Sequence, residues 1–266
     1  MAVQALCPLR AGPDSAPLPE FRRRGEFEAL GRGHFENVRA IADLKPDDRV
    51  LDVGCGLGRV ALHFAGFLDM RGRYDGFDAS RTGVDWCNAR IAPRHPKFRF
   101  VHADIRNRQY NPHGALDAAS FIFPYADESF SLAYATSVLT HLLPDAAAHY
   151  LKEIARVLRP GGRSLVTFFI INDESRRHMV RSGELRFEKT GQGYWTTQPD
   201  NPEACIAYEE QAVQEMHGEA GLEIAAPIRF GSWSSRAGLV GGQDHVLAFK
   251  RCAHFTQPCG QGGSGS

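Results

Sequence analysis

Short apolar runs alternate with amphipathic stretches along the chain from about residue 33. The apolar runs are short and closed by turn residues, which is typical of buried parallel strands. Between them, apolar positions recur at helical spacing, and Thr82 with Asp85 has the spacing of a capping box at a helix start. Strands that alternate with helices predict a parallel sheet with right-handed crossovers. The expected strands are 49–54, 74–78, 98–104, 130–135 and 164–171, and the expected helices are 58–69, a helix from residue 82, 145–158 and 209–221.

Two further strands are expected near the end of the chain, over 223–229 and 244–250. Too little sequence of helical character separates them for a crossover connection, so the last strand is predicted to run antiparallel to its neighbours. The expected fold class is therefore α/β, with a Rossmann-like, mostly parallel sheet.

Two long segments, 107–129 and 172–208, fit poorly into this alternation. Each follows the carboxyl end of a strand, where open α/β sheets bind ligands, so we expect both to form a cap over the site. The remaining pattern predicts a single domain over 21–252. Residues 1–20 are rich in proline and polar residues and are expected to be disordered, whereas 253–266 is expected to be a flexible tail or a remnant of cloning.

Composition excludes several classes of protein. Lys+Arg and Asp+Glu are 31 each, so the net charge is zero, which is not typical of a nucleic-acid-binding protein. No uncharged apolar stretch is long enough for a membrane span, and the N-terminal segment has no secretory-signal pattern. The six cysteines show no disulfide or metal-ligand spacing. These features predict a soluble, cytoplasmic protein without a metal site.

The most informative motif is a glycine-rich turn between the first strand and the following helix. Gly54, Gly56 and Gly58 follow Asp52 in the run LDVGCGLGR, and glycines there let the backbone approach a ligand closely. A dinucleotide fingerprint would place its third glycine one position later, at Arg59. The observed spacing, with an acid two residues before it, favours S-adenosylmethionine (SAM) over a pyrophosphate.

Acidic residues also end the next two predicted strands. Asp78, twenty residues after Gly58, is suited to accept from both ribose hydroxyls, a feature that SAM and NAD share. Asp104 is suited to accept from an adenine amino group, with Ile105 against the ring. Either acid could instead be a helix cap or a turn residue, but their repetition at successive strand ends predicts a site for an adenosyl ligand.

With these motifs in place, the sequence resembles the class I SAM-dependent methyltransferases, of the broad group that includes the ubiquinone-biosynthesis (UbiE-like) enzymes. The resemblance rests on VLDVGCGLGR, GFDAS, VHADI and the stretch from SVLTHLLP to RSLVTFF, and it covers about residues 25 to 250. Further segments, including YNPHG and GSWSSR with GQDHVLAFK, resemble a bacterial subgroup of that family. One departure is Ser131, where the family usually has an aspartate.

The resemblance implies a seven-stranded sheet with helices on both faces and an antiparallel last strand. It also implies an enzyme that uses SAM and releases S-adenosylhomocysteine (SAH). Arg59 would either reach the methionyl carboxylate or be a solvated helix residue. The residues implied to contact the cofactor are Asp52, Gly54, Cys55, Gly56, Gly58, Arg59, Asp78, Ala79, Asp104, Ile105, Thr136 and Ser137.

Methyl transfer requires mainly alignment of the acceptor with the methyl group and exclusion of water. A hydroxyl acceptor benefits from a general base, and His141, just past the fourth strand, is the candidate; the alternative is that it packs or caps the following helix. The residues expected to shape an acceptor pocket, or else to fasten loops and core, are Tyr125, Tyr194, Trp195, Tyr208, Trp233 and Arg236.

The expected function is thus methyl transfer to a hydroxyl or amine of a small molecule or a glycan. Two alternatives remain: an NAD-dependent oxidoreductase, which the glycine spacing disfavours, and a SAM-binding protein without catalysis. The sequence does not indicate an oligomeric state.

Overall fold

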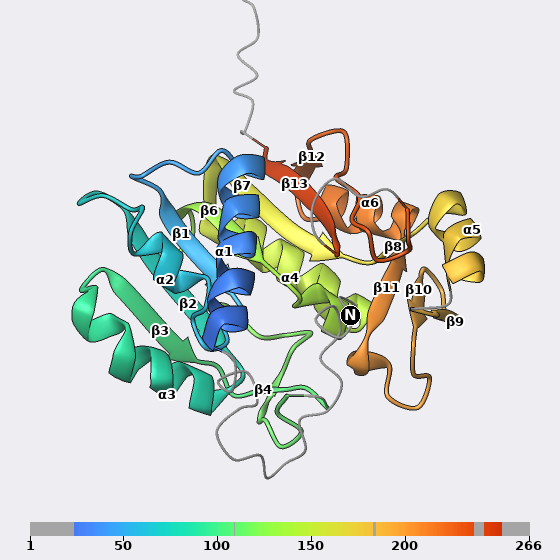
Figure 1. Ribbon diagram of the computed structural model, residues 1–266, viewed down its shortest axis with the longest axis horizontal. Helices are drawn as coiled ribbons and strands as arrows, with labels where there is room; N and C mark the ends of the chain where they lie inside the picture. The colour runs from blue at the N-terminus through green and yellow to red at the C-terminus, as the bar shows by residue number, and fades with distance from the viewer. Residues whose placement is uncertain (1–23, 109, 183–184, 237–241, 252–266) are drawn as a thin grey trace, which may run out of the picture.

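Seven strands form the central sheet of the protein, of which the computed structural model describes residues 24–108, 110–182, 185–236 and 242–251. The sheet order is β12-β13-β7-β6-β1-β2-β3 (Figure 1). Strands β3, β2, β1, β6 and β7 pair in parallel, and β13 is antiparallel to both of its neighbours, as predicted. The strand bounds are β1 Arg49–Val53, β2 Arg73–Asp78, β3 Phe98–His102, β6 Phe130–Ala135, β7 Leu158–Phe168, β12 Leu222–Ile224 and β13 Asp244–Lys250.

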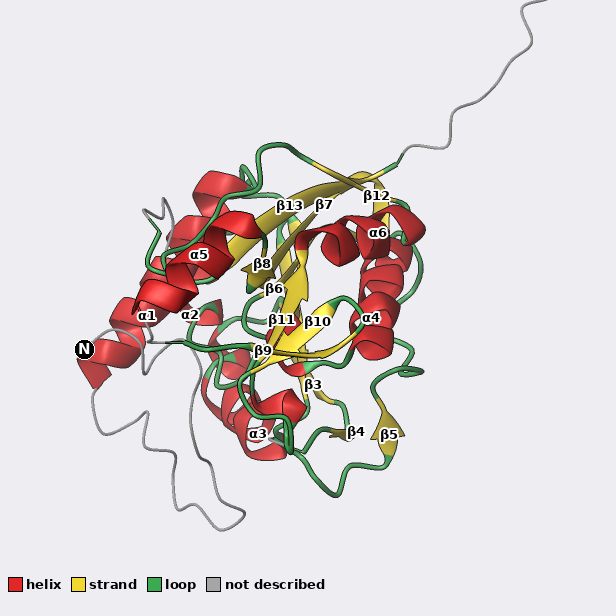
Figure 2. Cartoon of the chain, turned by 90° about the vertical axis from the view of Figure 1, so that its right-hand side faces the viewer, coloured by secondary structure: helices red, strands yellow, loops and turns green. Residues whose placement is uncertain are grey.

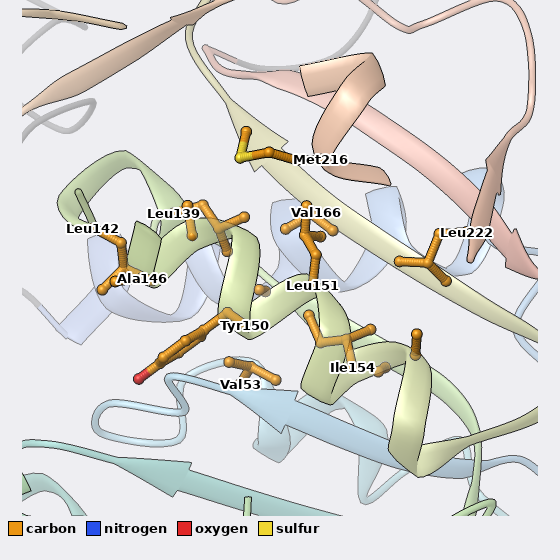
Figure 3. Close-up of a cluster of buried hydrophobic side chains, with 14 of the residues drawn as sticks. Val53, Leu139, Leu142, Ala146, Tyr150, Leu151, Ile154, Val166, Met216 and Leu222 are labelled. Carbon is orange, nitrogen blue, oxygen red and sulfur yellow. The ribbon is translucent and has the colours of Figure 1, made fainter. Parts of the chain in front are cut away.

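Helices cover both faces of this sheet, because each face carries its own apolar cluster. One cluster joins the sheet to α1, α2 and α3, through side chains such as Phe35, Phe64 and Val84. The other joins it to α4 and α6, where Leu151 and Val166 lie in the same buried cluster (Figure 3). The helix bounds are α1 Arg24–Ile41, α2 Ala61–Phe64, α3 Arg81–Arg90, α4 Pro144–Val157, α5 Asp173–Ser182 and α6 Glu210–Glu219, with single 3₁₀ turns at Ala92–Arg94, Leu139–His141 and Pro202–Ala204.

The strand order of the sheet reverses at the boundary between the neighbouring strands β1 and β6. From β1 it proceeds to β2 and β3 on one side, and later elements lie on the side of β6. Open α/β sheets bind their ligands at such a switch point, beside the carboxyl ends of the strands. The glycine-rich turn follows β1 directly and therefore lies at this place.

The segment 172–208, predicted to be irregular, contains regular structure. A second sheet has the order β8-β11-β10-β9 and lies beside α4 and α6 (Figure 2). Its alternating pattern is short and interrupted by polar residues, so the sequence did not indicate it. The bounds are β8 Ile170–Ile171, β9 Glu188–Gly191, β10 Tyr194–Thr196 and β11 Ile206–Glu209.

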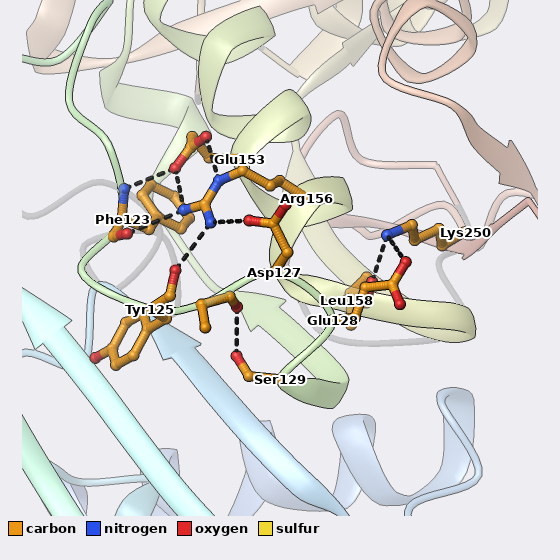
Figure 4. Close-up of polar contacts among 10 residues, drawn as sticks. Phe123, Tyr125, Asp127, Glu128, Ser129, Glu153, Arg156, Leu158 and Lys250 are labelled. Carbon is orange, nitrogen blue, oxygen red and sulfur yellow. Dashed lines mark hydrogen bonds and ion pairs between the residues drawn. The ribbon is translucent and has the colours of Figure 1, made fainter.

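The segment 107–129 contains little regular structure beyond the pairing of β5 (Leu116–Asp117) with β4 (Ile105–Arg106). It is nevertheless held in place by Arg156 of α4 (Figure 4). The guanidinium donates to the carbonyl oxygens of Phe123 and Tyr125 at 3.0 and 2.9 Å, and to the carboxylate of Asp127 at 2.7 Å. Glu153 accepts from Arg156 and from the Phe123 amide, both at 2.7 Å, so one ion pair fastens the segment to the sheet's helical layer.

Several predicted boundaries were wrong. Helix α1 was not predicted, and α2 is only four residues long, with turns in place of helix over 65–67. The start of α3 is capped by Ser80, whose side chain accepts from the Gly83 amide at 3.2 Å, and not by the Thr82 capping box. Strand β12 ends at Ile224, well before residue 229. The expected terminal segments 1–20 and 253–266 lie outside the described residues.

Candidate functional site

The turn after β1 has the backbone conformation that its glycines suggest. Gly54, Gly56 and Gly58 have φ of +81°, +52° and +68°, values that residues with a Cβ adopt only with strain. A Cβ on Gly54 would lie 2.4 Å from the Val138 side chain, and one on Gly58 would lie 2.5 Å from Ile91. By contrast, nothing lies within 4 Å of a Cβ on Gly56. The middle of the turn therefore borders open space in which a ligand can approach the backbone.

Asp78, at the end of β2, closes this turn from the neighbouring strand. Its carboxylate accepts from the amides of Gly56 and Ser80, both at 2.7 Å. Burial raises the pKa of Asp78 above its ordinary value, and the two amide donors oppose that shift. Asp78 as a residue is half-buried, and Ala79 beside it accepts through its carbonyl from the His102 ring at 3.2 Å. Asp78 thus has a structural role in the glycine turn and lies beside the open space at Gly56.

Asp52 lies in the core, which the sequence did not indicate. Its side chain is 3% exposed and accepts a hydrogen bond from the Tyr74 hydroxyl, which lies 3.0 Å from that of Tyr134. Burial raises the pKa of Asp52 to about 7, against the effect of both tyrosines. Cys55 is buried as well, and burial raises the pKa of its thiol. These two side chains support the turn from beneath.

Helix α1 contributes to the site from a region for which no element was predicted. Gly31 packs so closely on Arg59 that a Cβ there would lie 2.4 Å from the Arg59 carbonyl oxygen. His34 is half-buried on the same helix, and burial, followed by the charge of Arg59, lowers its pKa to about 4. Asn37 lies 3.4 Å from Nε2 of His245 on β13. In the sequence, the one indication that α1 packs closely on Arg59 is Gly31, three residues before His34.

The turn after β6 faces the glycine turn through Val138 and carries Thr136 and Ser137. Ser137 has φ of +58°, an uncommon conformation for a residue that is not glycine and one that often occurs at functional sites. Its amide donates to the Thr167 hydroxyl at 2.9 Å, and its own hydroxyl donates to the Gln243 side chain at 3.2 Å. Gln243 is thereby joined to the site by an interaction over 106 residues of sequence.

Asp104 follows β3 and holds the next segment. Its carboxylate accepts from the Asn111 side chain at 2.9 Å and from the Ala115 amide at 3.3 Å, which lowers its pKa. Asp104 is half-buried, whereas Ile105 is in the core at 4% exposure. An adenine contact of Asp104 would therefore use lone pairs that these two donors leave available.

His141 is held on both ring nitrogens. Nδ1 lies 2.9 Å from the Glu203 carbonyl oxygen, which can only accept, so Nδ1 carries the proton. Nε2 then accepts from the Tyr110 hydroxyl at 3.2 Å. The ring is 3% exposed, and burial lowers its pKa. This arrangement joins the segments 107–129 and 172–208 at the turn after β6, and it argues against the general-base hypothesis.

Trp233 and Arg236 belong to a buried network around Asp244, the first residue of β13. The Asp244 carboxylate accepts from the amides of Ile170 and Gly231 at 2.7 and 2.8 Å. It also accepts from the Trp233 indole at 2.7 Å and from Arg236 at 3.2 Å. Burial raises the pKa of Asp244 to about 6, although all four donors oppose this shift. Trp233 and Arg236 are 2% and 4% exposed, so both serve the core and not an open pocket.

The remaining aromatic candidates separate into buried and accessible positions. Tyr208 is 1% exposed and donates its hydroxyl to the Leu142 carbonyl, which excludes a stacking role on a bound ring in this conformation. Tyr125 and Tyr194 are half-buried. Trp195 is half-buried too, and its indole donates to Glu209 at 3.2 Å. The Tyr125 hydroxyl is buried, and its ring packs edge-on against Phe130, the first residue of β6, at 5.1 Å between ring centroids, so the prediction of an acceptor contact was wrong for Tyr125. Tyr194 and Trp195 remain the candidates for acceptor contacts.

Three other expectations concern thiols, metals and membranes. Cys55, Cys87 and Cys205 are free and buried, while Cys7, Cys252 and Cys259 lie outside the described residues. In the described part of the chain, no group of three or more acidic, histidine or cysteine side chains is arranged to hold a metal ion. Within the same ranges, no helix has both the length and the apolar character that a membrane crossing requires.

Comparisons with known proteins agree with this geometry. Residues 50–162 match a family model described as a methyltransferase domain. The 27-O-demethylrifamycin SV methyltransferase of Amycolatopsis mediterranei is 31% identical over 136 residues, which are 51% of this chain and 44% of that protein. The sterol 4-C-methyltransferase strm-1 of Caenorhabditis elegans is 27% identical over 214 residues, covering 78% of this chain and 51% of that protein. The chain thus spans about half the length of the curated relatives it matches.

Solved structures show the same fold. The 1,6-didemethyltoxoflavin-N1-methyltransferase of Burkholderia thailandensis aligns with a TM-score of 0.54 and 20% identity, over 91% of this chain and 94% of that one. A SAM-dependent methyltransferase of Aquifex aeolicus aligns with a TM-score of 0.55 and 14% identity, over 88% and 99%. Residues 50–162 thus match a methyltransferase domain, and the chain has the fold of these SAM-dependent methyltransferases, with the glycine turn at the switch point of its sheet.

Proposed function

We propose that this chain transfers the methyl group of SAM to a hydroxyl or amine of a small molecule or a glycan. The observation that carries the proposal is the pairing of the glycine turn with Asp78. Gly56 borders open space, and the carboxylate of Asp78 lies 2.7 Å from the Gly56 amide. An adenosyl ligand needs both features: a backbone that it can approach and an acceptor for its ribose hydroxyls.

The surrounding residues fit SAM in distinct roles. In this proposal Gly54, Gly56 and Gly58 line its methionyl side and Asp78 holds the ribose. Asp104 contacts the adenine, and Ile105 acts only through packing because it is 4% exposed. SAM supplies an electrophilic methyl group on a sulfonium, so the protein's contribution is alignment and exclusion of water.

The turn after β6 and the arginine before α2 complete the proposed cofactor site. Thr136 and Ser137 face the methionyl amine and sulfonium, since Val138 next to them touches the glycine turn. Arg59, whose carbonyl lies against Gly31 of α1, binds the methionyl carboxylate through its guanidinium. Asp52 and Cys55 act only by supporting the turn, because both are buried.

The acceptor class rests on relatives and on the composition of the site. Relatives include enzymes named as O-methyltransferases, such as that of Pyrenophora dematioidea, which is 33% identical over 129 residues. The Burkholderia thailandensis structure holds 1,6-didemethyltoxoflavin and SAH. Tyr194 and Trp195 would contact such a small acceptor. No strong base is assigned, because the His141 ring nitrogens already have protein partners.

A calorimetric titration with SAM, SAH and NAD tests the cofactor. We expect SAM and SAH to bind, and NAD not to bind. Asp78→Asn should weaken SAH binding at least tenfold, because a ribose acceptor loses its charge. The matched control is Asp85→Asn, an exposed aspartate on α3, which should leave affinity within twofold. If NAD bound and neither SAM nor SAH did, the methyltransferase proposal would be wrong and an NAD-dependent oxidoreductase would take its place.

Catalysis is tested separately with the purified protein, SAM and a panel of hydroxyl and amine acceptors, by following SAH release. SAH production that depends on an acceptor supports an enzyme. SAM binding without any acceptor-dependent turnover across the panel would instead favour a non-catalytic SAM-binding protein.

The role of His141 has its own test. We propose that it positions the turn after β6, so His141→Gln should lower activity while the pH dependence of kcat keeps its shape. A general base would instead lose an ionisation from that profile. Tyr110→Phe, which removes only the hydroxyl that donates to His141, should reproduce part of the effect.

A further inference from the structure

A hollow lies at the amino ends of β1, β2 and β3, at the opposite edge of the sheet from the glycine turn. Its volume is about 500 Å³, and its lining includes Arg49, Arg71, Arg73, Lys97 and Arg99. The three strands are neighbours in the sheet (Figure 1). Because they are parallel, their starts meet at one edge and their carboxyl ends at the other. The hollow is therefore separate from the glycine turn.

The register of the strands gathers like charges in this place. Arg49 on β1 is directly opposite Arg73 on β2, and Tyr74 is opposite Phe98 on β3. Lys97, which precedes Phe98, therefore continues the same row. Like charges directly opposite one another in a sheet are destabilising. A bound anion would offset the repulsion within this row.

Acidic neighbours neutralise only part of the charge. Arg73 donates to the buried Asp75 at 2.6 Å, and Arg71 donates to Asp69 at 3.0 Å. Arg49, Lys97 and Arg99 make no side-chain ion pair within the described residues. Arg49 and Arg99 are exposed. Three cationic side chains at one hollow are thus available to an anion.

The dimensions and the charge of the hollow indicate the kind of anion. About 500 Å³ is in the range of small-molecule pockets. Guanidinium groups bind phosphate oxygens in a bidentate manner. The whole chain has no net charge, so the positive field is local, unlike the extended basic surface of a nucleic-acid-binding protein. We infer that this hollow binds the di- or triphosphate group of a small molecule.

The test titrates the full chain with inorganic triphosphate at low salt and measures binding by calorimetry. We expect saturable binding with one site, and at least a tenfold weaker affinity in the double variant Arg49→Gln/Arg99→Gln. The matched control is Arg32→Gln/Arg90→Gln, which removes two exposed arginines elsewhere, on α1 and α3. It should retain affinity within twofold. A circular dichroism melt establishes that each variant is folded.

Several outcomes overturn the inference. They are the absence of saturable binding, equal weakening in both double variants, and binding of an RNA oligomer or of phosphatidylserine vesicles without binding of triphosphate. SAH affinity should be unchanged in Arg49→Gln/Arg99→Gln, since the glycine turn lies at the other edge. A failure here therefore leaves the methyltransferase proposal intact, and a failure of SAH binding leaves this inference intact.

Discussion

Gly31 offers a sharp test of how α1 packs on the glycine turn. It lies inside an 18-residue helix, where replacing glycine by alanine ordinarily stabilises a protein by up to about 1 kcal/mol. The new Cβ of Gly31→Ala, however, would lie 2.4 Å from the Arg59 carbonyl oxygen and 2.9 Å from its carbon. These atoms are backbone and cannot rotate away, so α1 or the turn must shift. Such overpacking costs about 1–3 kcal/mol.

The cost of overpacking is at least as large as the gain in helix propensity, so Gly31→Ala should lower the free energy of unfolding by up to about 2 kcal/mol. It should also weaken SAH binding, because Arg59 begins the segment that follows the glycine turn. Gly33→Ala is the matched control, since Gly33 is exposed on the same helix and nothing lies within 4 Å of its Cβ. That variant should be stabilised by up to about 1 kcal/mol.

Urea unfolding, monitored by circular dichroism, gives the free energies of unfolding. The comparison requires that the free energy depend on urea concentration with the same slope in both variants and in the parent protein. Calorimetry with SAH gives the affinities. If Gly31→Ala were as stable as Gly33→Ala and bound SAH normally, the close packing of α1 on Arg59 would be refuted.

Three further predictions concern buried ionisable side chains. Arg156→Gln should lower the free energy of unfolding by about 2–3 kcal/mol, because it leaves the buried Glu153 without its partner and releases the carbonyls of Phe123 and Tyr125; in urea unfolding, the exposed Lys152→Gln should change it little. Asp244→Asn should cost about 3 kcal/mol, because Arg236 is 4% exposed and would keep only the exposed Glu174, 3.6 Å away, as a counter-charge; a thermal melt no lower than that of Asp173→Asn would contradict this. Burial lowers the pKa of His217 to about 4 from 6.5, so its contribution to stability is present above pH 6.5 and is lost as the pH falls toward 4; between pH 7.5 and 5 this amounts to about 2 kcal/mol. Unfolding free energies at those two pH values should differ less in His217→Asn, and an equal difference would argue against a neutral buried ring.

The sequence was most informative where structure depends on neighbouring residues. The helix at Pro144–Val157 and strand β6 were predicted almost to the residue, because a sustained apolar stripe or run is decided locally. Boundaries were poorer where tertiary contacts decide them. In α2 the apolar spacing indicated twelve residues, but turns replace the helix after Phe64. The strands β9 to β11 are stabilised by pairing with one another, a contact that no single segment shows.

The candidate site divides in the same way. The sequence by itself determined the positions of the glycine turn and of the acids at the strand ends, because positive φ and strand-end carboxylates have distinct local patterns. Only the tertiary structure decided which of those side chains are buried and which already have protein partners. Asp52 hydrogen bonds to Tyr74 in the core, and Tyr110 and Glu203 engage both nitrogens of His141. These partners lie 22 to 62 residues away along the chain. Burial against a partner so distant in sequence cannot be predicted from the spacing of neighbouring residues.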